Sequence, residues 1–168
     1  MKITNTVRTL SAIALTLAGA FAASDSLAAS ATANGTATVI VPMGITKTND
    51  LRFGAFSPTT SAGTVTLSTA GARSASNVQL SSLNVGGAAG FNVTGDTTAT
   101  YAITLPSSAT LTGPGASMAI SAFTSNPSGT GTLTAGAGTI SVGGTLAVGA
   151  SQVAGAYTGT FSVSVDYN

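Results

Sequence analysis

The sequence contains no cysteine, histidine, glutamate or tryptophan. Without these residue types the chain cannot use a Ser–His or thiol nucleophile, and it lacks the usual zinc ligands. The acidic residues that remain are all aspartates and are scattered along the chain, at positions 25, 50, 96 and 166. Scattered aspartates supply neither the facing carboxylate pair of glycosidases nor a clustered calcium site. We therefore predict no catalytic, metal-binding or cofactor-binding residues, and no enzymatic activity.

Charge is also scarce, since charged residues make up 5% of the chain, against about a quarter in an ordinary soluble domain. Beyond residue 28 the basic residues Lys47, Arg52 and Arg73 balance Asp50, Asp96 and Asp166, so this part is neutral. We expect Asp50, between Lys47 and Arg52, to form a local ion pair. A neutral chain offers no basic patch for nucleic acid. So few ionic groups favour association over free solution.

The first residues have the pattern of a secretory signal peptide. Lys2 and Arg8 precede the uncharged apolar run Thr9–Ala22, and small residues follow around Ala28. The run is shorter than the roughly 20 residues that span a bilayer, and it lacks the polar face of an amphipathic cytosolic helix. We predict a signal peptide at residues 1–28, no transmembrane segment, and export to the periplasm and then to the cell surface.

The rest of the chain reads as short alternating strands separated by Gly, Pro, Asn and Ser. This spacing predicts an all-β, immunoglobulin-like sandwich of about 7–9 strands, with a barrel as the structural alternative. Regular Val, Ile, Leu and Thr alternation argues against disorder. The predicted strands are Thr36–Thr46, Leu51–Phe56, Thr64–Thr69, Val78–Val85, Gly90–Thr94, Thr100–Leu105, Ser117–Thr124, Thr139–Val148 and Tyr157–Tyr167.

Both ends of this domain alternate with period two. In the last predicted strand the odd positions from Tyr157 to Tyr167 are apolar or glycine, and the even positions are polar. From Ala29 to Met43 the odd positions are small or apolar, and only Ile40 and Pro42 interrupt the polar side. Such a segment can begin its own sheet or can complete the sheet of another subunit. We expect an N-terminal extension at residues 29–38 and a sandwich domain at residues 39–168.

Several stretches resemble the bacterial family catalogued as domain of unknown function 4402. The resemblance runs from about Thr36 to Asn168 and rests on motifs of common small residues. These are ITKTNDLRFG at Ile45–Gly54, FNVTG at Phe91–Gly95, YAITLP at Tyr101–Pro106 and AGAYTGTF at Ala154–Phe161.

The two termini are similar to those of chaperone–usher pilin subunits, which end in an alternating strand with a penultimate tyrosine and begin with a donor arm. The chain lacks the cysteine pair of many such pilins. The resemblance implies an incomplete sandwich, served first by a periplasmic chaperone and an outer-membrane usher and then completed by the next subunit. It implies donor side chains at Ala31, Ala33, Gly35, Ala37 and Val39, and an acceptor groove and chaperone-binding edge at Phe161, Val163, Val165 and Tyr167.

The sequence therefore favours a structural or adhesive cell-surface subunit that polymerises with like subunits by donor-strand exchange. Two alternatives remain open at this point. One is a self-contained secreted coat or matrix protein whose extension pairs within its own sheet. The other is a carbohydrate-binding adhesin module, which exposed aromatic side chains in a loop would support.

Overall fold

The computed structural model describes residues 28–168. The predicted signal peptide therefore lies outside the described residues, apart from Ala28. The chain divides into two units, Met1–Ala37 and Thr38–Asn168, and each is considered by itself. In the first unit, residues 28–37 are exposed and form no strand. Among the described residues there is no helix long and apolar enough to cross a membrane.

The second unit is all-β, which confirms the predicted fold class. It carries twelve strands rather than the expected 7–9. They are β1 Gly44–Asn49, β2 Phe56–Pro58, β3 Gly63–Leu67, β4 Arg73–Ser76, β5 Val78–Leu80, β6 Ala89–Thr94, β7 Thr100–Thr104, β8 Ser108–Leu111, β9 Met118–Asn126, β10 Thr130–Thr132, β11 Ala137–Val148 and β12 Ser164–Tyr167.

The strands form a seven-stranded sheet, a three-stranded sheet in the order β10-β7-β12, and the pair β2-β5. The large sheet is organised around β11. Residues Ala137–Val142 of β11 pair with β6, Gly144–Val148 pair with β3, and Ser141–Leu146 pair with β9. Because the β9 ladder overlaps both others, β6 and β3 follow one another along one edge of β11, and β9 occupies the opposite edge.

Glycine is required where β11 passes from β6 to β3. A Cβ atom at Gly143 would collide with the carbonyl oxygen of Leu67, which is main chain and cannot move aside. The ladder with β9 also shifts register between Gly143 and Thr145. A residue without a side chain lets the two ladders meet closely at this point.

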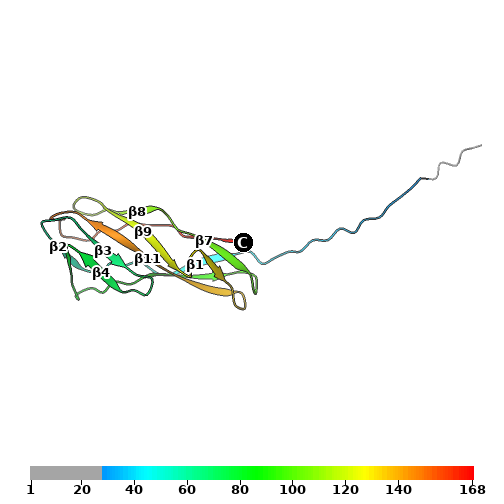
Figure 1. The fold of residues 1–168 in the computed structure, drawn as a ribbon, viewed down its shortest axis with the longest axis horizontal. Helices are drawn as coiled ribbons and strands as arrows, with labels where there is room; N and C mark the ends of the chain where they lie inside the picture. The colour runs from blue at the N-terminus through cyan, green and yellow to red at the C-terminus, as the bar shows by residue number, and fades with distance from the viewer. Residues whose placement is uncertain (1–27) are drawn as a thin grey trace, which may run out of the picture. The chain divides into compact units, whose positions relative to one another are not determined.

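The strands enclose two hydrophobic cores. The first core consists of Phe53, Val65, Leu67, Met118, Ile120, Leu146 and Val148. The second core consists of Ala89, Val93, Tyr101, Leu133, Ile140 and Val142. Leu51 and Phe123 pack against both cores and connect them. Figure 1 shows β2, β3 and β4 at one end of this unit, and β1, β7 and the C-terminus toward the other.

Four predicted strands are wrong in extent. Of the strand expected at Leu51–Phe56 only Phe56 lies in a strand, β2, and the strand expected at Val78–Val85 ends at Leu80. Residues 28–43 form no strand, so the strand expected from Thr36 begins only at Gly44. The strand expected over Tyr157–Tyr167 pairs regularly only from Ser164. Alternation alone does not make a strand, because each strand also needs a neighbour for its main-chain groups. The sequence reading also missed β4, β8 and β10, which are short and mostly polar.

Truncating Leu67 to alanine should lower the free energy of unfolding by about 2–5 kcal/mol, because it leaves a cavity beneath β11. Leu67 is 1% exposed, whereas Leu83 is 93% exposed. The matched substitution Leu83→Ala should change stability by no more than about 0.5 kcal/mol. Urea unfolding of both variants measures the difference, and equal effects would contradict the assigned core.

Candidate functional site

A cavity of about 780 Å³ lies between two extended segments of the second unit. One wall is Lys47–Phe56, which continues β1, and the other is Gly155–Phe161, which leads toward β12. Between the walls the lining is largely apolar and consists of Ala89, Phe91, Leu111, Met118, Ile120 and Leu146, with Asn84 at one side. We call this cavity the groove.

The groove gives access to the first core. Met118, Ile120 and Leu146 belong to that core and line the groove, as does Phe53 in one wall. Each of these four side chains is less than 9% exposed. A segment placed in the groove would therefore lie directly over the first core and extend its packing.

The C-terminal wall has main-chain groups without strand partners. Thr158 exchanges two backbone hydrogen bonds with Thr112, of 2.8 and 2.9 Å. Residues 159–163 belong to no ladder, and no backbone hydrogen bond outside the strands involves them in the described chain. Regular pairing resumes where Ser164 meets Thr104 of β7. This wall is thus an extended segment with an open edge.

The opposite wall is also bordered by an open strand edge. β1 is the terminal strand of the large sheet and pairs only with β6. After β1 the wall is held from its outer side, where Arg52 exchanges hydrogen bonds of 2.9 and 2.8 Å with Gly87. Two open edges thus flank an apolar floor, which is the arrangement that an added β-strand requires.

Arg73 fixes the shape of the first wall from behind. Its Nη1 donates hydrogen bonds of 3.1 Å to the carbonyl oxygens of Phe53 and Ala55, and its Nη2 donates one of 2.7 Å to that of Ser81. Gly54 has a φ of +73°, and a Cβ there would lie 2.5 Å from Arg73 Nη1. The guanidinium therefore joins three carbonyl groups of two chain segments, and Gly54 is the residue that permits its approach.

Tyr157 fixes the second wall. Its hydroxyl accepts hydrogen bonds from the main-chain N–H of Gly115 and the side chain of Gln152, and it donates to the carbonyl oxygen of Val153, at 3.0, 2.9 and 2.9 Å. A tyrosine bonded to main chain a few residues upstream is a familiar corner in β-sandwiches. Beyond this corner, Phe161 packs against the rings of Phe91 and Phe123, with centroids 6.5 and 5.1 Å away.

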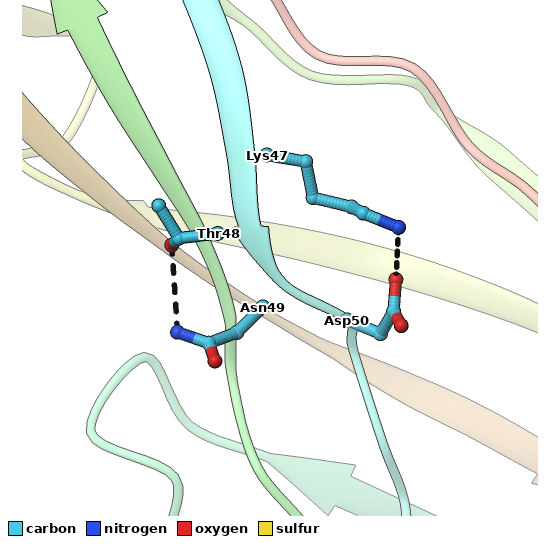
Figure 2. Close-up of polar contacts among 4 residues, drawn as sticks. All are labelled: Lys47, Thr48, Asn49 and Asp50. Atoms are coloured by element: carbon cyan, nitrogen blue, oxygen red, sulfur yellow. Dashed lines mark hydrogen bonds and ion pairs between the residues drawn. The ribbon is translucent and has the colours of Figure 1, made fainter.

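Charge at the groove comes from Lys47, Asp50 and Arg52, which lie at the end of β1 and just after it. Lys47 Nζ lies 2.6 Å from Asp50 Oδ1, as Figure 2 shows, and this confirms the local ion pair expected there. The hydrogen bond and the positive charge of Lys47 lower the pKa of the fully exposed Asp50 carboxyl from 3.8. Within the described residues, no group of three or more acidic side chains could hold a metal ion.

The structure brings one of the four predicted acceptor residues into the groove. Phe161 lines it, whereas Val163 and Val165 pack against the second core. The Tyr167 hydroxyl donates to the carbonyl oxygen of Val41 and accepts from the N–H of Asp96, both at 2.7 Å. The predicted donor residues lie in the strand-free segment and are exposed; they are Ala31, Ala33, Gly35, Ala37 and Val39.

The sequence reading missed the opposite wall and the floor. The sequence predicts strands at Leu51–Phe56 and Ser117–Thr124, which contain residues of this wall and of the floor, but it indicates no groove between them. The spacing of apolar residues cannot show whether a buried face is covered by the same chain. The one available signal was Asp50-Leu51-Arg52, where charges flank an apolar residue that packs against both cores.

Comparison with known proteins gives one match. A family model described as "Domain of unknown function (DUF4402)" matches residues 43–167. No curated protein and no solved structure matches the chain. The matched range begins one residue before β1, ends with β12 and leaves out the N-terminal extension.

Replacing Arg73 with alanine should lower the free energy of unfolding by about 2–3 kcal/mol, because carbonyl groups lose a charged donor in a partly buried place. Arg52→Ala is the matched control, since Arg52 is exposed and its side chain makes no hydrogen bond in the described structure. Urea unfolding compares the two. Similar losses for both arginines would contradict the role assigned to Arg73.

The Lys47–Asp50 pair should be visible in the titration of Asp50. A carboxyl group with a lowered folded pKa stabilises the fold above its unfolded pKa, and this contribution disappears as pH falls through the folded value. In Lys47→Gln the NMR titration midpoint of the Asp50 carboxyl carbon should rise toward 3.8. An Asp50 midpoint that is unchanged or lower in the variant would refute the pairing.

Proposed function

This chain belongs to the family described as domain of unknown function DUF4402, and from its groove and extension we propose that it is a pilin-like structural subunit of the cell surface. Subunits polymerise by donor-strand exchange, in which the N-terminal extension of one copy enters the groove of the next. The observation that carries the proposal is an apolar groove between two open strand edges, in a chain that also has an exposed segment with strand-like alternation.

Length supports this pairing of segment and groove. The extension has ten residues at positions 29–38, and the wall Lys47–Phe56 spans ten positions, nine of which line the groove. An extended segment of that length covers roughly 33 Å at 3.3 Å per residue. The extension can therefore follow the groove from end to end.

Side-chain size and charge also support it. The odd positions of the extension carry alanine or glycine, and residues 28–46 contain no charged side chain. Small side chains suit a groove whose floor is already filled by Phe53, Met118, Ile120 and Leu146. An uncharged strand enters such a place without the large cost of burying an ion.

Main-chain pairing supplies most of the attraction between the extension and the groove. Alanine side chains add little burial, and the floor side chains Phe53, Met118, Ile120 and Leu146 are already less than 9% exposed. Exchange therefore depends on the unpaired main-chain groups of the groove walls, which gain hydrogen-bond partners when a strand enters.

Export, a periplasmic chaperone and an outer-membrane usher belong to this proposal. An open apolar groove is an aggregation hazard before assembly, so a partner that lends a strand in transit would protect it. Such a partner would contact the C-terminal segment that carries Phe161, Val163, Val165 and Tyr167. None of the described aromatic side chains is exposed, so no observation favours the carbohydrate-binding alternative.

The test compares the chain starting at residue 29 with one starting at Val39. The longer chain should form concentration-dependent ladders that survive detergent without heating, and the shorter one should not. Sizing columns and unheated detergent gels measure both. Stable folded monomers from both chains would refute strand exchange and favour the self-contained coat or matrix protein.

Two single substitutions sharpen the comparison. Period-two alternation places Ala37 on the same face as the other donor residues and Thr36 on the opposite face. Ala37→Asp should abolish the ladders, because it places a carboxylate over the apolar floor, and Thr36→Asp should leave them largely intact. Loss of ladders in both would point to a general effect of charge rather than to an inserted strand.

A further inference from the structure

The four residues Val39–Pro42, which we call the base of the extension, join it to β1. We propose that Tyr167 and Pro42 favour insertion of the extension into a second copy of this chain. They hold the base in a position from which the extension cannot readily enter the groove of its own copy. The inference rests on the proposed strand exchange and adds a positioning role for two residues outside the groove. It concerns the choice between self-insertion, which would end growth, and insertion into another copy, which continues it.

Tyr167 holds the base at a fixed point. Its hydroxyl donates to the carbonyl oxygen of Val41 at 2.7 Å and accepts from the N–H of Asp96 at 2.7 Å. A Cβ on Gly95 would collide with this hydroxyl, so Gly95 leaves the space that the hydroxyl occupies. The Tyr167 side chain, which belongs to β12, thus joins the base to the loop between β6 and β7.

Pro42 restricts the direction of the chain at the same point. The ring of a proline disfavours the helical region for the residue before it, which keeps the backbone of Val41 extended. After Pro42 the chain continues through Met43 into β1 at Gly44. Met43 and Ile45 pack against the second core, as do Val163 and Val165 across from them. The chain is thus anchored immediately after the base.

The distance along the C-terminal strand makes self-insertion costly. The groove ends at Phe161 on that side, and Tyr167 lies six residues further along. Six extended residues span about 20 Å, and the wall Gly155–Phe161 spans about 23 Å more. The twelve residues 29–40 reach about 40 Å at full extension. Self-insertion would therefore exhaust the segment before it reached the far end of the groove. Because β1 leads from the base toward Lys47 in the groove wall, the segment would also have to reverse its direction at Val41.

A second copy avoids both costs. Its extension approaches from outside the acceptor, so all ten residues 29–38 are available to the groove and no reversal is needed. Backbone strain at Val41 and loss of the hydrogen bond from Tyr167 to Val41 would arise only in the self-inserted form. The partner that enters the groove is therefore the extension of another copy of this chain, which has no charged side chain and alternates with period two.

The experiment uses the chain from residue 29 and its variants Tyr167→Phe, Pro42→Gly and the double variant. Ladder formation is measured in unheated detergent gels. Amide exchange of residues 29–39 is measured by mass spectrometry on dilute monomer. In the unsubstituted chain these amides should exchange freely in the monomer. In the double variant they should become protected at every concentration, and the ladder fraction should fall severalfold.

Tyr101→Phe is the matched control, because Tyr101 faces Tyr167 across the β7–β12 ladder and makes no contact with the base through its hydroxyl. It should leave both readouts unchanged. The single variant Pro42→Gly removes no hydrogen bond. It therefore still tests the inference if loss of the Tyr167 hydroxyl causes the other variants to misfold. Unchanged ladders and freely exchanging monomers in the double variant would overturn the inference while strand exchange stands. An unsubstituted chain without ladders would overturn both.

Discussion

The requirement that every main-chain N–H and C=O find a partner governs this domain. β11 satisfies it on both edges, with β6 and β3 on one side and β9 on the other. The C-terminal segment does not satisfy it, because residues 159–163 have neither a ladder nor another backbone hydrogen bond within the described chain. The same constraint therefore explains the well-packed centre of the fold and the groove at its margin.

The two walls of the groove are held by different means. Arg73 joins the carbonyl groups of Phe53, Ala55 and Ser81, and the Tyr157 hydroxyl joins three groups at the opposite wall. Both anchors act through side chains rather than through a ladder. The walls can therefore stay in place while the main-chain groups of residues 159–163 remain available to a further strand. A groove that is formed in advance loses less free energy to ordering when its occupant arrives.

The sequence predicted the all-β class, the family and the local pairing of Lys47 with Asp50, because these depend on residues close together in the chain. It also predicted the half-buried odd positions Phe161, Val163 and Val165, which alternate as expected. It did not predict that Met118 and Ile120 would be reached through a groove, or that Tyr167 would bond to Val41. Those features depend on which distant segments become neighbours. Period-two alternation indicates which face of a strand is buried, but it does not identify the neighbouring segment.

The lack of charge in the extension has a consequence for the environment in which an assembly could persist. Residues 28–46 carry no charged side chain, and Lys47 and Asp50 at the groove neutralise one another, which leaves the charge of Arg52 uncompensated among the residues that line it. A joint between copies would then hold no pair of oppositely charged side chains across it. Electrolytes weaken contacts by screening such forces over about 8–10 Å at physiological ionic strength. Filaments of this composition would therefore lose little of their strength through ionic screening when the salt concentration of their surroundings rises.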